Sequence, residues 1–488
     1  MAVAILILYS LALLIIFIYS LSQLQLLLNY LKAKKQPDIS ARFDLSDPLQ
    51  IPMVTIQLPL YNELYVVERL LDNIAEIDYP KNRLEIQVLD DSTDESVALI
   101  ASKISELQKL GFDIQHFHRE ARTGFKAGAL KEGLKSAKGQ FIAIFDSDFL
   151  PKKDWLLQTV PYFKNPQIGV VQTRWAHINR DYSWLTKIQA FALDFHFILE
   201  QTGRNFGRHF INFNGTAGIW RKECILDAGN WSGDTLTEDL DLSYRAQLKN
   251  WKFKYLEYVE TPAELPVAIS AAKSQQFRWN KGAAENFRKN YWKLLTDRSA
   301  SFSTKFHGFF HLLNSSMFLI VLLLAVLSVP VLYIKNQNPQ LVWYFNWLGV
   351  FLLSTIIFFF CYYVAWKKIH GGSFRSFLKF IGMFFSYFSV VMGFSLHNSI
   401  AVLEGHLGKK SEFIRTPKFN INRTNQNWKT NKYLTQALSP QLIMELGLWL
   451  YFGFGLYSAF LLKDFSLAIF HFMLFLGFGF VVFKTIRT

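Results

Sequence analysis

The sequence predicts an α/β domain inserted between membrane-spanning α-helices. Hydrophobic residues make up 51% of the 488 residues, which is too many for an ordinary soluble protein of this size. Long apolar runs lie toward both ends of the chain, while the segment of about residues 40–300 holds most of the acidic residues. This segment alternates strand-like and helix-like stretches. The chain is therefore expected to combine one soluble domain with several membrane helices.

The charge pattern favours a membrane protein over one that binds nucleic acid. The net charge is +14 at pH 7, but the basic residues crowd at the ends of apolar runs and form no stripe on a soluble face. We assign the excess to membrane topology and expect no nucleic-acid partner. Because only two cysteines are present, Cys224 and Cys361, neither a disulfide framework nor a cysteine-rich metal site is expected.

The first apolar run, residues 1–31, is followed at once by Lys32, Lys34 and Lys35. It is longer than the core of a signal peptide, lacks a basic start and shows no small-residue cleavage site. We therefore predict a membrane helix whose C-terminal end faces the cytoplasm. Two further spans are predicted within 306–366 and two within 441–488, because apolar runs there approach the ~20 residues that a bilayer core requires. These runs cover 307–334, 342–366, 442–462 and 465–484.

The apolar stretch 374–403 is predicted to lie at the membrane interface or to be re-entrant. Small and polar residues recur along it at steps of three or four, which places them on one stripe of a helix. If the stretch crossed the bilayer, the seven basic residues that follow it would face outward, against the positive-inside rule. Five spans are therefore predicted, and a sixth at 374–403 is the alternative. The seven basic residues are Lys409, Lys410, Arg415, Lys418, Arg423, Lys429 and Lys432.

Short apolar strands alternate with helices in the first half of the inserted domain. This alternation is typical of an α/β sheet that binds a nucleotide, in which ligands lie at the carboxyl ends of the strands. Functional residues are therefore expected where the strands end. The predicted strands are Val54–Leu58, Leu84–Leu89, Asp113–Phe117 and Phe141–Phe145, and predicted helices include Tyr65–Ile77 and Lys126–Ala137.

Polar residues follow the first two predicted strands and are candidates for nucleotide binding. Pro59, Tyr61 and Glu63 follow the first strand, and Asp91 follows the second. The carboxylates are suited to hydrogen bonds from a base or ribose, and Tyr61 is suited to stacking on a base. For each residue alone, a turn or helix-capping role is an equal alternative. Their position at successive strand ends favours binding.

A divalent cation is predicted beside a phosphate-binding turn. The small-residue turn 123–129 opens a helix, so its backbone amides and Lys126 are suited to a pyrophosphate. Asp146 and Asp148 come directly after an apolar strand, and their hard oxygen ligands suit Mg²⁺ or Mn²⁺. An ordinary loop is the alternative for this Asp-x-Asp pair. No zinc site is expected.

A candidate base lies just before an amphipathic helix. Thr237, Glu238 and Asp239 stand there, and capping is the simplest role for Thr237. A carboxylate in this position is suited to act as a general base, which takes the proton from an attacking hydroxyl group. Asp239 is the predicted base.

A cation and an aromatic plane follow further along the chain. Gln275 precedes Arg278 and Trp279 by a few residues. The guanidinium of Arg278 is suited to a diphosphate and the indole of Trp279 to a sugar ring. Cation-π packing alone is the alternative for this pair.

The order of these motifs resembles that of family 2 processive glycosyltransferases. The shared pattern is Asp-Asp, Asp-x-Asp, Thr-Glu-Asp and Gln-x-x-Arg-Trp within one domain between membrane helices. Over about residues 50–290 the sequence is similar to the plant cellulose-synthase-like A and C families, which make mannan or glucan backbones. The matching stretches are LDDSTD (89–94), RTGFKAGAL (122–130), FDSDF (145–149), QTRW (172–175), FNGTAGIWR (213–221), TEDLDLSYRA (237–246) and QQFRWNKG (275–282).

The resemblance implies a GT-A fold, a Rossmann-like domain that binds a nucleotide sugar, and a role for each motif. Asp91 would contact the nucleoside, Asp146 and Asp148 the diphosphate and metal ion, and Asp239 would be the base. The other catalytic groups would be Glu238, Gln275, Arg278 and Trp279. The acceptor end would be lined by Phe213, Asn214, Gly215, Thr216 and Trp279.

The predicted cytosolic loop 404–440 carries a further similarity. Its residues 413–418 resemble the gating-loop motif Phe-x-Val-Thr-x-Lys of bacterial cellulose synthase, with Arg415 where valine is usual. Thr416 and Lys418 would then approach the diphosphate of the donor. The alternative is a merely basic cytoplasmic loop. No cyclic-dinucleotide-sensing domain is expected after the last span.

Taken together, the resemblance implies an inverting, processive β-glycosyltransferase in the membrane, with its catalytic domain in the cytoplasm. The donor would be GDP-mannose or UDP-glucose, the acceptor a growing β-linked polysaccharide that is moved across the bilayer, and the cofactor Mg²⁺ or Mn²⁺. Two alternatives stay open: a non-processive enzyme that glycosylates a ceramide or polyprenyl phosphate, and a catalytically silent nucleotide-sugar-binding protein. The sequence makes no prediction about accessory subunits.

Overall fold

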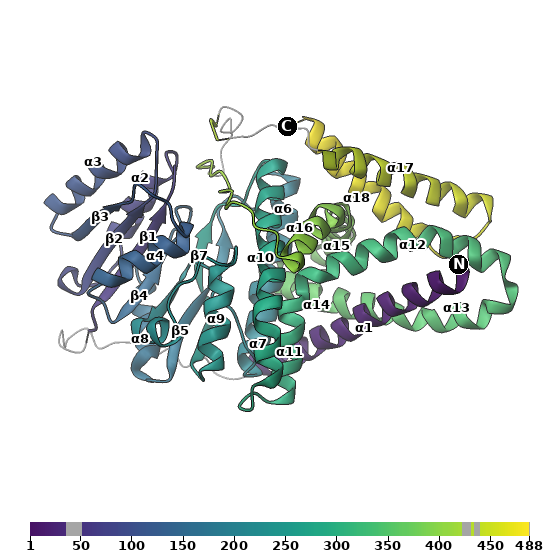
Figure 1. Ribbon diagram of the computed structural model, residues 1–488, viewed down its shortest axis with the longest axis horizontal. Helices are drawn as coiled ribbons and strands as arrows, with labels where there is room; N and C mark the ends of the chain where they lie inside the picture. The colour runs from purple at the N-terminus through teal and green to yellow at the C-terminus, as the bar shows by residue number, and fades with distance from the viewer. Residues whose placement is uncertain (36–50, 422–430, 434–439, 488) are drawn as a thin grey trace.

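The computed structural model describes residues 1–35, 51–421, 431–433 and 440–487. Figure 1 shows an α/β domain at one end of the molecule, a bundle of long helices at the other, and helices such as α6, α10 and α16 between them. The start of the predicted domain 40–300 and parts of the predicted loop 404–440, including Arg423 and Lys429, lie outside the described residues.

The α/β domain is built on a seven-stranded mixed sheet with the order β3-β2-β1-β4-β6-β5-β7. Strands β1 to β4 run parallel, β6 runs antiparallel to β4 and β5, and β7 runs parallel to β5. The predicted α/β class is thus confirmed, and each predicted strand is present with small shifts at its ends. The strands are β1 (Val54–Leu60), β2 (Leu84–Asp90), β3 (Asp113–His118), β4 (Phe141–Ile144), β5 (Ile168–His177), β6 (Gly218–Arg221) and β7 (Lys252–Ala263).

Helices cover both faces of this sheet. Leu70 of α2 and Ile100 of α3 belong to the apolar core on one face, and Leu130 of α4 and Leu242 of α9 belong to the core on the other. Burying each such side chain contributes about 1.5–3 kcal/mol. The domain helices are α2 (Val67–Ala75), α3 (Ser96–Lys109), α4 (Phe125–Ser136), α5 (Trp155–Thr159), α6 (Trp184–Asp194), α7 (Gln201–Phe206), α8 (Lys222–Asp227), α9 (Glu238–Leu248) and α10 (Ile269–Thr296), with the π-helix η4 (Phe195–Glu200) between α6 and α7.

The register of the parallel strands aligns the ends that carry polar residues. Leu60 at the end of β1 pairs with Asp90 at the end of β2. On the other side of β1, Gln57 pairs with Ile144, the last residue of β4. The segments that follow β1, β2 and β4 therefore leave the same edge of the sheet, as expected for a site of this class.

By length and composition, six helices of the described chain could cross a membrane: Ala2–Ala33, Phe302–Gln337, Pro339–His370, Phe374–Gly393, Pro440–Leu461 and Ala468–Ile486. They flank the α/β domain in the sequence and form the bundle in Figure 1. Their helices are α1 (Ala2–Ala33), α11 (Phe302–Leu313), α12 (Met317–Gln337), α13 (Val342–Leu348), α14 (Leu352–His370), α15 (Phe374–Gly393), α17 (Pro440–Leu461) and α18 (Ala468–Arg487).

The predicted interfacial stretch 374–403 forms two helices with a break at Phe394. The first is α15, and the second is α16 (Ser395–Leu407), which packs along α10 of the α/β domain. His397 Nε2 lies 2.9 Å from the backbone oxygen of Lys273 in α10. Lys281, a fully buried lysine of α10, forms an ion pair of 3.0 Å with Glu404. The second helix therefore leads back to the α/β domain.

Two glycines let α15 approach α18 closely. A Cβ added at Gly477 would overlap the backbone oxygen of Ser389, and a Cβ at Gly393 would overlap the backbone oxygen of Gly477. Small residues allow such backbone contact between helices in a bilayer, where close packing stabilises association. The glycine at 477 is therefore required for this crossing.

We expect Gly477→Ala to destabilise the protein by about 1–3 kcal/mol, because a methyl group cannot fit without separating the two helices. The melting temperature in detergent, followed by tryptophan fluorescence, measures this. The matched control is Gly447→Ala in α17, where a Cβ would meet nothing within 4 Å. Equal melting temperatures for both variants would contradict the close crossing.

Candidate active site

A cleft opens where β1, β2 and β4 end, and most of the predicted site residues line it. The segment 413–418 and one side of α10 close it opposite the sheet. The predicted residues that line the cleft are Pro59, Tyr61, Glu63, Asp91, Lys126, Asp146, Asp148, Asn214, Gly215, Glu238, Asp239, Gln275, Arg278, Trp279, Thr416 and Lys418.

Phe213 and Thr216, which were expected at the acceptor end, lie behind this lining. Phe213 is fully buried, with its ring centroid 5.5 Å from that of Trp220. The hydroxyl of Thr216 accepts a hydrogen bond of 2.9 Å from the backbone N–H of Asp146. Both residues therefore support the wall of the cleft, and only Asn214 and Gly215 of this segment reach its surface.

Asp91 is held by a two-pronged ion pair at one end of the cleft. Arg119 donates from Nε to Asp91 Oδ1 at 2.7 Å and from Nη2 to Oδ2 at 2.6 Å. The guanidinium of Arg122 lies 3.5 Å from the ring centroid of Tyr61. Sequence reasoning did not single out these two arginines, although Arg122 opens the RTGFKAGAL stretch. Two arginines, a carboxylate and a tyrosine ring together suit a nucleoside and its first phosphate.

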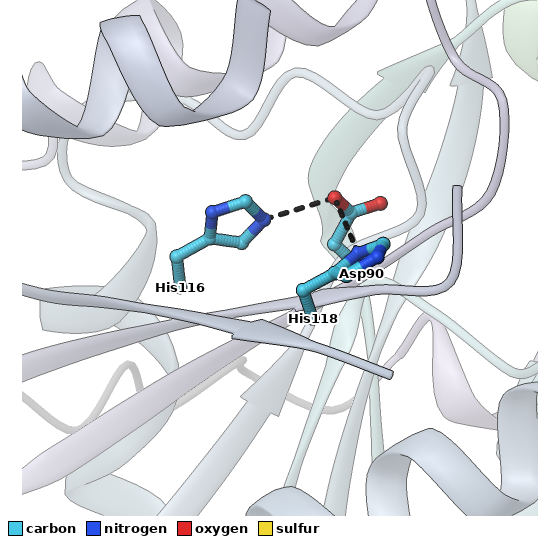
Figure 2. Close-up of side chains that lie close together, drawn as sticks. All are labelled: Asp90, His116 and His118. Atoms are coloured by element: carbon cyan, nitrogen blue, oxygen red, sulfur yellow. Dashed lines mark hydrogen bonds and ion pairs between the residues drawn. The ribbon is translucent and has the colours of Figure 1, made fainter. Parts of the chain in front are cut away.

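Next to this end, two histidines converge on the buried carboxylate of Asp90, as Figure 2 shows. His116 Nε2 lies 2.9 Å and His118 Nδ1 3.5 Å from Asp90 Oδ2. Burial alone would raise the pKa of Asp90, but hydrogen bonds from His116 and Ser92 hold it below its usual value. Among the described residues, this group could hold a metal ion with one ligand atom from each side chain. None of the three lines the cleft.

No zinc site was expected from the sequence, and these three residues were not among the predicted site residues. The sequence feature that could have indicated this group is the His-x-His pair of the third strand, which lies beside the Asp-Asp end of the second strand. Parallel pairing of Asp90 with His118 and of Val88 with His116 places all three side chains on one face of the sheet. Such pairing depends on strand register, which a spacing in the sequence does not reveal.

Two lysines hold the Asp-x-Asp pair. Lys126 of α4 donates to Asp146 Oδ1 at 2.5 Å and to the backbone oxygen of Gly215 at 2.9 Å. Lys418 lies 2.8 Å from Asp148 Oδ2. The other oxygen of Asp148 is buried and has no hydrogen-bond partner among the described residues. An unpartnered carboxylate oxygen beside a second carboxylate is a suitable ligand set for a hard divalent cation.

Asp239 stands in the first turn of α9 with Glu238 beside it. Burial, and then repulsion by Glu238, raise the pKa of Asp239 to about 7, while Lys126 acts in the opposite direction. A Cβ at Gly215 would lie 3.1 Å from Asp239 Oδ2, so the glycine, at φ +78°, keeps the space in front of this carboxyl group open. A carboxyl group that titrates near neutral pH suits proton transfer.

Helix α10 presents Gln275, Arg278 and Trp279 to the same cleft. The guanidinium of Arg278 interacts electrostatically with four carboxylates of the cleft, those of Asp146, Glu238, Asp239 and Asp148. Gly282, one turn further along α10, allows this helix to touch Thr237, the residue that precedes α9. Asn286 donates to Thr237 Oγ1 at 2.9 Å, so Thr237 joins the two helices and does not cap α9 with its side chain.

Residues 413–418, the candidate gating segment, lie over the cleft. The ring of Phe413 lies 4.4 Å from the guanidinium carbon of Arg278. Arg415 forms a two-pronged ion pair with Glu63, with Nε to Oε1 at 2.8 Å. The arginine that departs from the bacterial motif therefore has a partner at the end of β1. Glu264, which sequence reasoning missed, anchors the residues after this segment by accepting from the Phe419 backbone at 2.9 Å.

Comparisons with known proteins agree with this geometry. Residues 52–282 match the family described as "Glycosyltransferase like family 2". The chain is 34% identical over 456 residues to glucomannan 4-beta-mannosyltransferase 9 of Arabidopsis thaliana, covering 88% of this chain and 81% of that protein. It is 37% identical over 377 residues to probable glucomannan 4-beta-mannosyltransferase 3 of Oryza sativa subsp. japonica, covering 75% and 65%.

A solved structure shows the shared fold. Mannosyltransferase PcManGT from Pyrobaculum calidifontis, in complex with GDP-Man and Mn2+, aligns with a TM-score of 0.51 at 20% identity, over 75% of this chain and 100% of that one. The α/β domain therefore has the GT-A fold that the sequence motifs imply.

The raised pKa of Asp239 predicts how stability depends on pH. The pKa of Asp239 in the folded protein, about 7, exceeds the ordinary value of 3.8. The wild-type protein therefore loses stability as the pH rises from about 4 to about 7, and this contribution is constant at higher pH. Because Asp239→Asn removes this loss, its melting temperature should exceed that of the wild type by several degrees at pH 8 and by less at pH 5.

Asp234→Asn is the opposite control, because Lys289, 2.7 Å from Asp234, helps to lower the pKa of this carboxyl group. This variant should lose stability relative to the wild type above pH 4. A difference for Asp239→Asn that stayed constant from pH 5 to pH 8 would show that its carboxyl group ionises normally.

Proposed function

Because the chain belongs to glycosyltransferase family 2, with glucomannan 4-beta-mannosyltransferases among its relatives, we propose that it transfers mannose from GDP-mannose to a growing β-linked polysaccharide. One observation carries this proposal: Asp239, with its pKa near neutrality, shares a cleft with Asp146, Asp148 and Arg278. These are the base, the cation ligands and the diphosphate contact that an inverting transfer needs. UDP-glucose is the competing donor.

The transfer is a single displacement. The acceptor hydroxyl attacks the anomeric carbon as its proton passes to the carboxylate of Asp239, the new glycosidic bond forms, and the bond to the nucleoside diphosphate breaks. The electron pair leaves with the diphosphate, whose growing charge lies near Arg278 and Lys126. The acceptor attacks the face of the sugar opposite the leaving group, so the configuration at the anomeric carbon is inverted.

A divalent cation is part of this proposal. The unpartnered oxygen of Asp148 and the adjacent Asp146 support a site for Mg²⁺ or Mn²⁺, and the lysines now paired with these carboxylates would yield to it. When bound, the cation neutralises charge on the diphosphate. Lys126 and Lys418 remain near enough to contact phosphate oxygens.

The gating segment completes the donor site. Thr416 is buried, and its hydroxyl has no hydrogen-bond partner among the described residues, which leaves it available to a phosphate oxygen. Phe413 and Arg415 fix the segment to α10 and β1. Closure of this kind excludes water and protects the activated sugar from hydrolysis.

Polar side chains continue from the acceptor end into the bundle, and they support translocation of the product. Asn214 Oδ1 lies 3.2 Å from His196 Nε2, and His196 Nδ1 lies 2.9 Å from Glu200 Oε2. Glu200 in turn accepts from Gln23 of α1 at 3.0 Å. Buried polar groups among membrane helices are costly and usually serve a polar substrate. Further buried oxygens without partners in the described residues belong to Ser315, Ser395, Asn398 and Ser399.

We also propose five spans and a cytoplasmic catalytic domain. The basic end of α1, Lys32 to Lys35, lies on the side of the domain, since α1 packs along α7. The start of α15 lies beside α6, and α16 packs along α10, so both ends of the α15–α16 pair contact the α/β domain. A re-entrant pair accounts for these contacts without a sixth crossing.

The test is transfer from radiolabelled GDP-mannose and UDP-glucose by the full chain in nanodiscs, with Mg²⁺ or Mn²⁺ and with excess chelator. We expect a high-molecular-weight product from GDP-mannose that a mannanase digests, and loss of activity on chelation that metal restores. An organic-extractable product would make the chain a glycolipid transferase, and no product from any donor would make it catalytically silent.

Asp239→Asn should lower turnover by about 100-fold or more, because it keeps the size of the side chain but removes the proton acceptor. Binding of GDP, measured by calorimetry, should persist. Asp234→Asn, which changes an aspartate outside the cleft, is the matched control and should keep normal turnover. If Asp239→Asn retained most of its activity, Asp239 would have a structural role only.

For the gating segment, we expect Thr416→Ala combined with Lys418→Ala to lower kcat by about tenfold or more, since contacts made only in the closed cleft are lost. Because Lys418 pairs with the buried Asp148, the melting temperature should fall by a few degrees, so kcat is compared at a temperature where both proteins are folded. Lys410→Ala is the control, because Lys410 is an exposed cation of the same basic stretch that does not line the cleft. Equal, small effects of both changes would mean that the stretch only sets membrane topology.

A further inference from the structure

A second cavity of about 600 Å³ lies away from the catalytic cleft, where α6 meets the end of α14 and the start of α15. An apolar groove of about 530 Å³ adjoins it between α15, α17 and α18. We propose that the two together bind one anionic phospholipid from the leaflet beside the catalytic domain. The cavity takes the headgroup and the groove takes an acyl chain.

The cavity carries positive charge that the protein leaves unbalanced. Arg375 and Lys379 lie one turn apart at the start of α15, both exposed, and neither forms an ion pair within the described ranges. By contrast, Arg180 is neutralised by Asp194, with Nη2 donating to Oδ1 at 2.8 Å. The fourth cation of the cavity, Lys187, lies 3.7 Å from the exposed carboxylate of Asp181. Two cations therefore remain for an anionic group.

The start of α15 adds to this preference for an anion. Ser373 caps the helix by accepting from the backbone N–H of Ser376 at 3.2 Å, and the first turn contains no acidic residue. The free backbone amides at a helix N-terminus favour negative charge. This contribution acts on the same side of the cavity as Arg375 and Lys379.

The groove continues from the cavity because Trp184 and Ser386 line both. Trp184 is 48% exposed, and an indole at the boundary of headgroup and acyl chain is typical of membrane interfaces. Beyond these two residues the groove is almost wholly apolar. Its walls include Phe385 and Val390 of α15, Trp449 of α17, and Phe472, Leu476 and Phe480 of α18.

This junction of a basic cavity with an apolar groove favours a lipid over a soluble anion. A free phosphate compound would use the cavity alone and would leave the groove without an occupant. Basic pockets between membrane helices, at the level of the headgroups, are typical sites for anionic lipids. The apolar end of the site lies between α15 and α18, two of the helices that could cross the bilayer.

The occupied site would connect the bilayer to the acceptor end of the cleft. α6 runs directly into the π-helix that carries His196 and Glu200, and α15 leads through α16 to α10, which carries Trp279. A lipid bound between α6 and α15 therefore braces both elements. Binding itself does not require the proposed transfer reaction.

The experiment uses the full chain in nanodiscs of equimolar palmitoyl-oleoyl phosphatidylglycerol and phosphatidylcholine, released into mild detergent for native mass spectrometry. We expect one phosphatidylglycerol to be retained over phosphatidylcholine by about tenfold. Arg375→Gln with Lys379→Gln should abolish this preference. The matched control, Lys293→Gln with Lys410→Gln, removes two exposed cations that line neither cavity and should keep it.

Two further measurements distinguish binding of the whole lipid from binding of a soluble headgroup. Ser386→Trp fills the junction and should reduce retention of both lipids, whereas millimolar glycerol phosphate should not displace phosphatidylglycerol. Melting temperatures report whether each variant is folded. Equal retention of the two lipids by the wild type, full preference in the Arg375/Lys379 variant, or displacement by glycerol phosphate would each overturn the proposal.

Discussion

Charge compensation in the cleft is the interaction on which the rest of this structure depends. Four carboxylates gather there, two of them buried and two half-buried, and a charge removed from water is costly unless it is paired. The cations that balance them come from α4, α10 and the gating segment, which are far apart in the sequence. The sheet, the helix at the membrane side and the loop after α16 are thereby held to one another. The carboxylates are Asp146, Asp148, Glu238 and Asp239, and the cations are Lys126, Arg278 and Lys418.

The parts of the fold that could be predicted are those with a local signal. β1 to β4 are short apolar runs bounded by polar residues, so their existence and their ends follow from the sequence to within two residues. β6 has only four residues, Gly218–Arg221, and runs antiparallel between its neighbours, which no periodicity indicates. The π-helix Phe195–Glu200 likewise depends on packing against α1 and α14 rather than on local preference.

The same distinction holds for the site. The positions of Asp91, Asp146 and Asp148 in the cleft could be predicted, because each follows a strand and these strands end at one edge of the sheet. Arg119 and Glu264 could not, since each acts by contacting a carboxylate or a backbone that lies far away in the chain. Phe213 and Thr216 are the opposite case: their motif resembles that of the family, but their side chains lie behind the wall of the cleft. A motif therefore identifies a segment more reliably than the side chains that reach the substrate.

The two ion pairs of the gating segment, Arg415 with Glu63 and Lys418 with Asp148, set a condition on donor entry. Under the proposed function, a nucleotide sugar would enter only molecules in which the segment has moved away from the cleft, so the apparent dissociation constant would be the intrinsic one divided by the fraction of open molecules. Until the proposed divalent cation binds, Lys418 is the counter-ion of Asp148. Discrimination between guanosine and uridine donors can therefore arise from how far each shifts the balance from open to closed, even where their direct contacts with the protein are equally strong.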